Sequence, residues 1–412
     1  MKILHTVENL IGGMGEVVVK ISNKLAERGH LVSIATKTDR LFNEKQLNKN
    51  IKLFKFNLNG NFSLKIKGDI EKYQNFLLNS NFDIITNFAA QQPLTDVMIQ
   101  ILDKIKAKKV FVPTGFSALY NRKYRKYFDN MKLWMNKYDM NIFLSNDYQD
   151  INFAFQNSIK NIIVIPNGAD EDEFSKKHFK SIRDEFSIPK DDFLIIHVGS
   201  HTGIKGHKEA IKIFKMANIK NTTFLIIGHN FNNKGCWKLC NKLSKKLNKS
   251  NQFKVNKKFF LVEMLSRERV VEFYHEADLF LFPSNIECSP IVLFEAMASK
   301  TPFLVTNVGN SKEIIKWSNG GLLLPTFKTY FSINYFKDIF KIFYKIITLK
   351  IFLEKPVYSK ADIRKSALML ENLYNNKNYR SILANNGYNA WKNKFTWDKI
   401  AKEYEYVYKK II

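Results

Sequence analysis

The sequence predicts an α/β protein of two domains, each with a parallel sheet of the Rossmann-like type, facing a shared cleft. Three observations support this prediction. The chain has 412 residues, which is too long for one ordinary domain. Short apolar runs alternate with amphipathic segments of helix length, as in β/α/β units. This alternation runs through two series, which predict an N-terminal domain over residues 1–160 and a C-terminal domain over residues 161–390.

The first series begins with a strand at residues 2–7, followed by a glycine-rich turn at residues 12–15. An amphipathic helix then runs from about residue 16 to residue 28, where Gly29 ends it. Because later apolar runs are also strand-length, we expect one parallel sheet in this half. Its further strands are predicted at residues 31–36, 83–86, 109–112 and 140–145.

The second series opens with a strand at residues 162–165, which Pro166 and Gly168 end. The predicted strands and helices then alternate again. The strands are expected at residues 193–198, 223–227, 258–262, 279–282 and 302–306, and the helices at residues 206–217, 267–275 and 290–299. Helical patterns resume near residue 361, and the last helix, from Trp397, has an apolar face that we expect to pack on a domain.

The composition limits the class of protein. Apolar residues make up 45% and charged residues 25%, which excludes wholesale disorder, collagen-like repeats and a coiled-coil rod. The 65 Lys and Arg against 38 Asp and Glu give a net charge of +27, which attracts phosphate, an anionic membrane surface or nucleic acid. No recognised nucleic-acid-binding module accompanies this charge, so we expect no nucleic acid partner.

The cysteines and the apolar runs bear on compartment and on metals. Cys236, Cys240 and Cys288 are too few for a disulfide framework, which favours a reducing cytoplasm. Cys236 and Cys240 lie four positions apart on a predicted helix, and without two further ligands they predict no metal site. The N-terminus does not resemble a signal peptide, and no apolar run is long enough to span a membrane. We therefore expect a cytoplasmic protein whose membrane contact, if any, is peripheral.

Two carboxylates in residues 283–298 are the strongest candidates for chemistry. Glu287 is predicted in the loop beyond a strand end, and Glu295 lies just over one turn into the helix that Pro290 begins. A solvated helix residue and a loop charge are the alternative interpretation of this pair. Backbone N–H groups at the start of the helix suit a phosphate or a sugar hydroxyl. These groups belong to Ser289, Ile291 and Val292.

The segment with Glu287 and Glu295 resembles a motif of the retaining glycosyltransferases of family 4, which have the GT-B fold. The resemblance extends over nearly the whole chain. The E-x7-E element and its alanine-rich helix are similar to residues 287–298, and the family's downstream glycine and acid to residues 309–315. The resemblance also implies that residues 391–412 form a helix that returns to the N-terminal domain. The other landmarks occur in the family's order, at residues 12–15, 166–170, 199–206 and 395–397.

The resemblance implies roles for individual residues. Glu295 would bind the ribose of a nucleotide diphosphate-sugar donor, Glu287 would contact the donor sugar, and Lys205 would meet the phosphates. A fixed lysine there would stabilise the charge that develops on the leaving diphosphate. Glu287 and Lys205 are thus the candidate catalytic residues, and no catalytic base is assigned. The other implied donor-binding residues are Gly13, Met14, Gly199, His201, Ser289, Ile291 and Val292.

The chain departs from the family pattern in the phosphate loop. The family usually has an arginine shortly after the glycine at Gly199, whereas Ser200 and His201 follow here. His201 is expected to replace that arginine in part, although a neutral imidazole supplies less charge. Asp170 and Asp172 spell the D-x-D of metal sites in another glycosyltransferase fold, but their place after Pro-Asn-Gly favours a helix N-terminus. We expect no metal and no cofactor, since the nucleotide-sugar is a substrate.

The resemblance implies a retaining glycosyltransferase, which we expect to act on a lipid-linked or polysaccharide acceptor at the inner membrane face. Two basic and aromatic stretches, at residues 121–135 and 336–347, suit an anionic membrane surface. The second lies in an insertion relative to the family, residues 327–360. An amphipathic helix packed on its own domain explains either stretch equally well. A nucleotide-sugar epimerase of the same fold and a non-catalytic basic binding protein remain alternatives.

Overall fold

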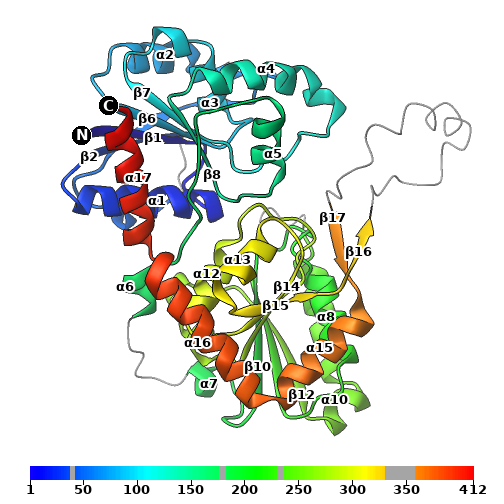
Figure 1. Ribbon diagram of the computed structural model, residues 1–412. Coiled ribbons are helices and arrows are strands. Elements are labelled where there is room, and N and C mark those ends of the chain that lie inside the picture. The colour runs from blue at the N-terminus through cyan, green and yellow to red at the C-terminus, as the bar shows by residue number, and fades with distance from the viewer. Residues whose placement is uncertain (38–41, 176–181, 231–234, 330–357) are drawn as a thin grey trace, which may run out of the picture. The chain divides into compact units, whose positions relative to one another are not determined.

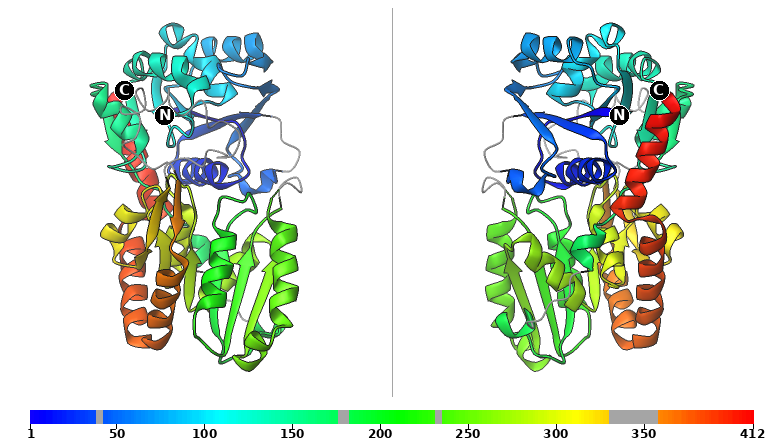
Figure 2. Two further views of the ribbon diagram at one scale, coloured as in Figure 1. Left: turned by 90° about the vertical axis from the view of Figure 1, so that its right-hand side faces the viewer. Right: turned by 90° about the vertical axis from the view of Figure 1, so that its left-hand side faces the viewer.

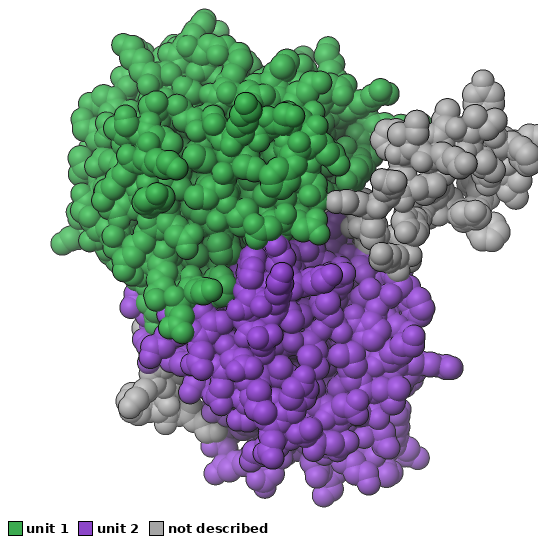
Figure 3. Space-filling view, viewed as in Figure 1, with its two compact units in different colours: residues 1–171, 288–291, 393–412 green, residues 172–287, 292–392 purple. Residues whose placement is uncertain are grey.

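The computed structural model describes residues 1–37, 42–175, 182–230, 235–329 and 358–412, in two compact units (Figure 3). Unit 1 comprises residues 1–171, 288–291 and 393–412, and unit 2 comprises residues 172–287 and 292–392. Each unit has one central parallel sheet with helices on both faces (Figure 1). The prediction of two Rossmann-like α/β domains is therefore confirmed.

The sheet of unit 1 has seven parallel strands in the order β3-β2-β1-β6-β7-β8-β9. Its topology reverses between β1 and β6, which are neighbours although four strands separate them in sequence. The strands are β1 (Lys2–Val7), β2 (Leu31–Lys37), β3 (Lys52–Phe56), β6 (Ile84–Phe88), β7 (Lys108–Val112), β8 (Met140–Phe143) and β9 (Ile162–Val164). A short antiparallel ribbon of β4 (Leu58–Asn59) and β5 (Lys67–Gly68) follows β3.

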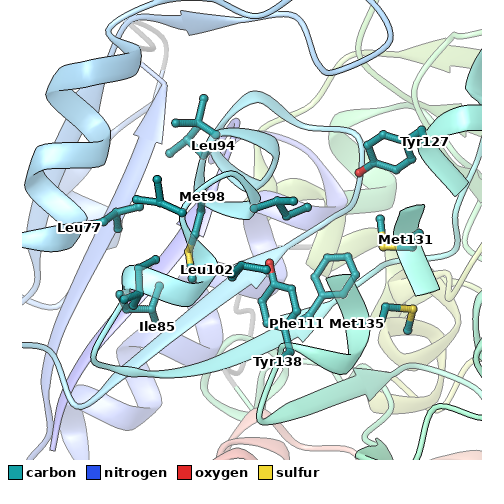
Figure 4. Close-up of a cluster of buried hydrophobic side chains, with 14 of the residues drawn as sticks. Leu77, Ile85, Leu94, Met98, Leu102, Phe111, Tyr127, Met131, Met135 and Tyr138 are labelled. Atoms are coloured by element: carbon teal, nitrogen blue, oxygen red, sulfur yellow. The ribbon is translucent and has the colours of Figure 1, made fainter. Parts of the chain in front are cut away.

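Helices cover both faces of this sheet. One face packs against a core to which four helices contribute, α2 (Ile70–Leu78), α3 (Pro93–Ile99), α4 (Arg125–Asn136) and α5 (Gln149–Gln156) (Figure 4). The other face packs against α1 (Gly13–Glu27) and the C-terminal helix α17 (Trp397–Ile411). Figures 1 and 2 show α17, in red, within the N-terminal unit. This return of the C-terminal helix confirms the expectation from the family resemblance. Short 3₁₀ turns lie at Glu44–Gln46, Leu102–Lys104 and Arg122–Tyr124.

Strand β1 contributes side chains to the cores on both faces of the sheet. Its side chains alternate between faces, so Ile3 and Val7 enter the core under α1 and α17 while Leu4 enters the opposite core. His5, on the α17 face, is fully buried, with Nε2 3.0 Å from the Tyr408 hydroxyl. The last helix is therefore joined to the first strand by both packing and hydrogen bonding.

The sheet of unit 2 has six parallel strands in the order β12-β11-β10-β13-β14-β15. Its order reverses between β10 and β13. The strands are β10 (Phe193–Val198), β11 (Thr222–Ile227), β12 (Lys258–Glu263), β13 (Leu279–Phe282), β14 (Phe303–Thr306) and β15 (Gly321–Leu324). An antiparallel pair, β16 (Thr326–Thr329) and β17 (Tyr358–Ala361), lies beside them.

One face of this second sheet packs on α8 (His207–Met216), α9 (Trp237–Asn248), α10 (Asn251–Val255), α15 (Ile363–Asn375) and α16 (Lys377–Lys394). The ring of Tyr274 on α11 (Arg267–Glu276) packs on Phe280 of β13. Leu279 and Leu281, the neighbours of Phe280 on this strand, point to the opposite face and enter the core with α8 to α10, α15 and α16. The remaining helices are α6 (Glu171–Phe174), α7 (Ile182–Glu185), α12 (Ile291–Ala298) and α13 (Ser311–Ser318).

The structure corrects two expectations about the elements and tests one of the two basic stretches. The strand predicted to open the second series is β9, which pairs with β8 in the sheet of unit 1. Helix α1 begins at Gly13, so of residues 12–15 only Gly12 adopts a positive φ, of 91°. The basic stretch at residues 336–347 lies outside the described residues. The stretch at 121–135 forms the turn before α4 and most of α4, whose residues Tyr127 and Met131 are buried in their own unit.

Candidate active site

The loops after β10 and β13 define the candidate site in unit 2. These strands are adjacent and parallel, and the strand order reverses between them. Loops that follow the carboxyl ends of strands at such a reversal form the ligand-binding crevice of open α/β sheets. The loop after β10 spans residues 199–206, and the loop after β13 spans residues 283–290. Both loops contain residues that the sequence analysis singled out.

Lys205 and Glu287 meet between these two loops. The Lys205 Nζ lies 2.8 Å from each carboxylate oxygen of Glu287, and the hydroxyl of Ser284 donates to Oε1 over 2.7 Å. The Glu287 side chain is 8% exposed and that of Lys205 is 28% exposed. The two candidate catalytic residues are therefore in direct contact, with the lysine still accessible to an anion.

Backbone contacts and one glycine hold the loops together. The backbone N–H of Asn285 donates to the carbonyl of Ile204 over 2.9 Å, directly before Lys205. Gly206 has a left-handed φ of 73°, and a Cβ there would lie 1.9 Å from the Pro283 carbonyl oxygen. Only glycine combines this φ with so close an approach of two backbones. The position of Lys205 therefore depends on Gly206.

Glu295, on α12, is buried beside an arginine that the sequence analysis did not identify. Its Oε1 lies 2.6 Å from Nη1 of Arg267 at the start of α11, and only 3% of the Glu295 side chain is exposed. Arg267 also donates to Glu173 from Nε and Nη2. Burial, and then the charge of Glu295, raise the pKa of Tyr274 well above its ordinary value, so this hydroxyl remains a proton donor. The carboxylate is thus held in one orientation.

Spacing in the sequence gives no sign of Arg267. It lies 28 positions before Glu295, on a different helix, and β13 separates the two helices in the chain. An arginine at the first position of a helix, where the helix dipole is unfavourable for a cation, is the weak signal that was available.

The start of α12 carries the other predicted donor-binding residues of this region. Ile291 and Val292 occupy the first turn of α12, where N–H groups have no partner within the helix. Residues 288–291 belong to unit 1. There the carbonyl of Ser289 accepts a hydrogen bond from Nδ2 of Asn167 over 3.0 Å. Ile291 packs against the core under α1 and α17.

Gly13 and Met14 lie in the first turn of α1 in unit 1. A Cβ at Gly12 or Gly13 would meet nothing within 4 Å, whereas a Cβ at Gly15 would overlap the Leu10 carbonyl group. Gly15 is therefore required for packing, while Gly13 leaves open space beside the helix N-terminus. A helix start with open space beside it suits an anionic or sugar ligand.

Gly199 and His201 belong to the loop after β10, but the imidazole of His201 is 1% exposed. Its ring stacks on that of His207, with centroids 4.3 Å apart, and its Nδ1 lies 3.4 Å from Sγ of Cys236. The Gly199 carbonyl accepts a hydrogen bond from Nε2 of His207. His201 therefore points into the interior of unit 2, rather than outward as a substitute for the family's arginine would.

Unit 1 contains a strained loop directly after β7 and Pro113. Thr114, Gly115 and Phe116 all have positive φ angles. The carboxylate of Asp150 accepts from the Gly115 N–H over 2.8 Å, and burial raises the pKa of Asp150 to about 6. A Cβ at Gly115 would lie 2.8 Å from Sγ of Cys288. Backbone strain of this kind concentrates at functional sites.

Asp170, the first aspartate of the D-x-D motif, forms an ion pair within unit 1. Asp170 lies 2.9 Å from Nζ of Lys20, and Glu171 lies 2.9 Å from Nζ of Lys24, both on α1. The second oxygen of Glu171 accepts from the backbone N–H of Trp397 at the start of α17. Asp170 and Glu171 therefore attach the end of unit 1 to its helices.

The two Rossmann-like units, with acidic and basic side chains at the strand reversal of unit 2, define the GT-B class of glycosyltransferases. Family models agree. The model of glycosyl transferases group 1 matches residues 178–330, and that of Glycosyltransferase Family 4 matches residues 11–173. The chain belongs to this group 1 and family 4 of glycosyltransferases.

Relatives and solved structures are similar along most of the chain. An uncharacterized 41.2 kDa protein in the cps region of Klebsiella pneumoniae is 21% identical over 79% of this chain and 86% of its own length. N-acetyl-alpha-D-glucosaminyl L-malate synthase of Bacillus anthracis is 22% identical over 78% of this chain and 83% of its own. Sucrose-phosphate synthase from Thermosynechococcus elongatus superimposes with a TM-score of 0.75 at 16% identity, covering 100% of this chain and 99% of that one. HepE of Anabaena, solved with UDP, gives 0.68 at 14% identity, covering 99% of both.

Over the described ranges, no helix is long and apolar enough to cross a bilayer.

Proposed function

We propose that this glycosyltransferase transfers a sugar from a nucleoside diphosphate-sugar, with retention of anomeric configuration, to a lipid-linked or polysaccharide acceptor of a cell-surface glycan. The contact between Lys205 and Glu287 carries the proposal. It places a partly exposed cation and a carboxylate at the strand reversal of unit 2, where a diphosphate and its sugar would bind.

Each residue then has a role that fits its surroundings. Lys205 exchanges its bond with Glu287 for the leaving diphosphate and stabilises the charge that develops there. Glu287, released from the lysine, accepts hydrogen bonds from hydroxyls of the donor sugar. Glu295, oriented by Arg267, accepts from the ribose hydroxyls. Backbone N–H groups in the first turn of α12 bind phosphate or sugar oxygens.

Two comparisons support the choice of substrates. HepE was solved in complex with UDP, which favours a nucleoside diphosphate donor. The Klebsiella pneumoniae relative is encoded in a cps region, which favours a glycan acceptor. The Bacillus anthracis relative, N-acetyl-alpha-D-glucosaminyl L-malate synthase, is named for L-malate rather than for a glycan. The acceptor therefore has to be determined on this chain.

Thermal stabilisation by a panel of UDP-, GDP- and ADP-sugars tests the donor. A ligand at about 100 times its Kd adds about 2.7 kcal/mol to the stability of the folded state. We expect one nucleotide series to raise Tm, and Glu295→Ala and Lys205→Ala to abolish that rise. Lys208→Ala, an exposed lysine on α8, is the matched control and should keep it. No shift with any nucleotide-sugar would overturn the proposal.

A second assay separates transfer from epimerisation. Incubation of the selected donor with candidate lipid-linked and oligosaccharide acceptors should yield a glycosylated product with the donor's anomeric configuration by NMR. Conversion of the nucleotide-sugar to its epimer without an acceptor would instead support the epimerase alternative.

A further inference from the structure

Three side chains of unit 2, from separate segments, bring metal-ligating atoms together. His201 lies in the loop after β10, His207 begins α8, and Cys236 directly precedes α9. One ligand atom from each lies within 4.8 Å of the other two. Both histidines are almost fully buried, and Cys236 is partly buried. These are nitrogen and sulfur donors, the set that Zn²⁺ prefers.

Hydrogen bonding determines which histidine atoms are available. Nε2 of His207 lies 3.0 Å from the Gly199 carbonyl oxygen, which can only accept, so this nitrogen carries the proton. Nδ1 of His207 then holds a lone pair, and it is buried without a hydrogen-bond partner among the described residues. A histidine whose other nitrogen donates to a backbone carbonyl is the usual arrangement of a metal ligand.

The distance between one pair of donor atoms matches that in a tetrahedral metal site. In tetrahedral coordination, Zn–N of about 2.0–2.1 Å and Zn–S of about 2.3 Å place the two donor atoms about 3.6 Å apart. Nδ1 of His201 lies 3.4 Å from Sγ of Cys236. A hydrogen bond from the thiol to the imidazole has a similar length, so experiment has to distinguish the two.

The spacing of the histidines in the sequence also fits a zinc site. His201 and His207 are separated by five residues, which is within the spacing of histidine ligands in structural zinc sites. As a thiolate, Cys236 would have the form of cysteine that binds metals.

We propose that His201, His207 and Cys236 bind a structural Zn²⁺ ion. This departs from the sequence-based expectation of no metal, which rested on the two cysteines alone. The ion would join the loop after β10 to the starts of α8 and α9. The segments already approach closely, because the Cys236 N–H donates to the His201 carbonyl and a Cβ at Gly235 would overlap that oxygen. The site would therefore fix the loop that carries Lys205.

Metal content and cobalt spectroscopy on the full-length protein, purified without a histidine tag, test the site. We expect about one zinc per chain by mass spectrometry. After chelation, titration with Co²⁺ should produce the d–d bands of tetrahedral cobalt and a thiolate-to-cobalt charge-transfer band. Absence of zinc together with absence of the charge-transfer band would overturn the proposal and leave a thiol–imidazole hydrogen bond.

Variants locate the ion. Cys236→Ser and His207→Asn should each weaken Co²⁺ affinity by more than about tenfold. Cys288→Ser, which changes a cysteine of unit 1, is the control and should leave the affinity unchanged. Circular dichroism verifies that each variant is folded. If Cys236→Ser unfolds the protein, the wild-type charge-transfer band still decides whether a thiolate is a ligand. Zinc retained equally by folded Cys236→Ser and His207→Asn would overturn the assignment, whatever the outcome for the nucleotide-sugar.

Discussion

Arg267 and Glu295 form a 2.6 Å ion pair between the first residue of α11 and the interior of α12. The carboxylate is almost completely buried, whereas about a third of the arginine side chain is exposed. Arg267 also donates to Glu173, and its guanidinium lies 5.8 Å from the ring centre of Phe174. Glu295, which we propose to bind ribose, is therefore oriented by Arg267, and Arg267 is itself held by Glu173.

Replacing this arginine should destabilise unit 2. In Arg267→Ala the Glu295 carboxylate loses its charged partner but stays buried, which we expect to lower the free energy of unfolding by about 1–3 kcal/mol. Urea denaturation measures the change. The double variant Arg267→Ala with Glu295→Gln should lose less than the sum of the single variants, because no buried charge remains. Additive losses would show that the two residues do not interact.

Lys205→Ala should lower the rate of catalysis. Loss of one group that stabilises developing charge typically lowers kcat by about 100- to 1,000-fold, and we expect a loss in that range for transfer from the selected donor. Steady-state kinetics at saturating donor measure it. Lys208→Ala should keep full activity. If Lys205→Ala retained wild-type kcat, the lysine would have only the structural role of pairing with Glu287.

Much of the fold could be predicted from local patterns. Apolar runs and helix periodicity indicated strands β10 to β14 and helices α8, α11 and α12 to within a few residues. Strand β9 was assigned to the wrong series because its apolar run is equally suited to either sheet, and pairing with β8 is a tertiary property. The start of α1 was predicted near residue 16 because glycines at positions 13 and 15 are typical of turns. The helix begins at Gly13, since of residues 12–15 only Gly12 has a positive φ.

The candidate site was predictable in part for a similar reason. Lys205 and Glu287 come from motifs of the family, and the strand order brings them together. Arg267 belongs to no motif of the family that the sequence shows. Its partner Glu295 lies 28 positions away, on another helix of unit 2. Such pairs arise only when helices pack on a sheet, and no period in the sequence encodes them.

Gly206 should be sensitive to the smallest side chain. An alanine at this position combines an unfavourable left-handed φ with a Cβ only 1.9 Å from the Pro283 carbonyl oxygen. We expect Gly206→Ala to lower the free energy of unfolding by more than about 2 kcal/mol and to weaken donor binding, because Lys205 would move. Urea denaturation and Tm shifts with the donor measure the two effects.

Gly203 provides the matched control for Gly206. It also has a positive φ, of 87°, but a Cβ there would meet nothing within 4 Å. Gly203→Ala should therefore cost only about 1–2 kcal/mol for the left-handed conformation and leave the position of Lys205 unchanged. Equal effects of the two substitutions would contradict the close approach of Gly206 to Pro283.

His5 should make the stability of unit 1 depend on pH. Burial lowers the pKa of His5 to about 3, from an ordinary value near 6.5, so the folded state holds the neutral imidazole. Between these values the unfolded state binds more protons, and stability falls as pH decreases from about 6.5 towards 3, at up to about 1.4 kcal/mol per pH unit. Asp96 and Asp150 act in the opposite direction, because burial raises their pKa values to about 7 and 6.

The contribution of His5 is isolated by comparing urea denaturation of the wild type and His5→Gln from pH 7 to pH 4. The two aspartates are common to both proteins, so the difference between the curves reports His5. We expect the wild type to lose its advantage over the variant as pH falls. Tyr408→Phe, which removes the hydroxyl 3.0 Å from His5 Nε2, should lower stability by about 1–3 kcal/mol at pH 7. It should leave most of the pH dependence in place, because burial rather than this hydrogen bond lowers the pKa of His5. A difference between wild type and His5→Gln that does not change with pH would mean that the imidazole is not held neutral in the core.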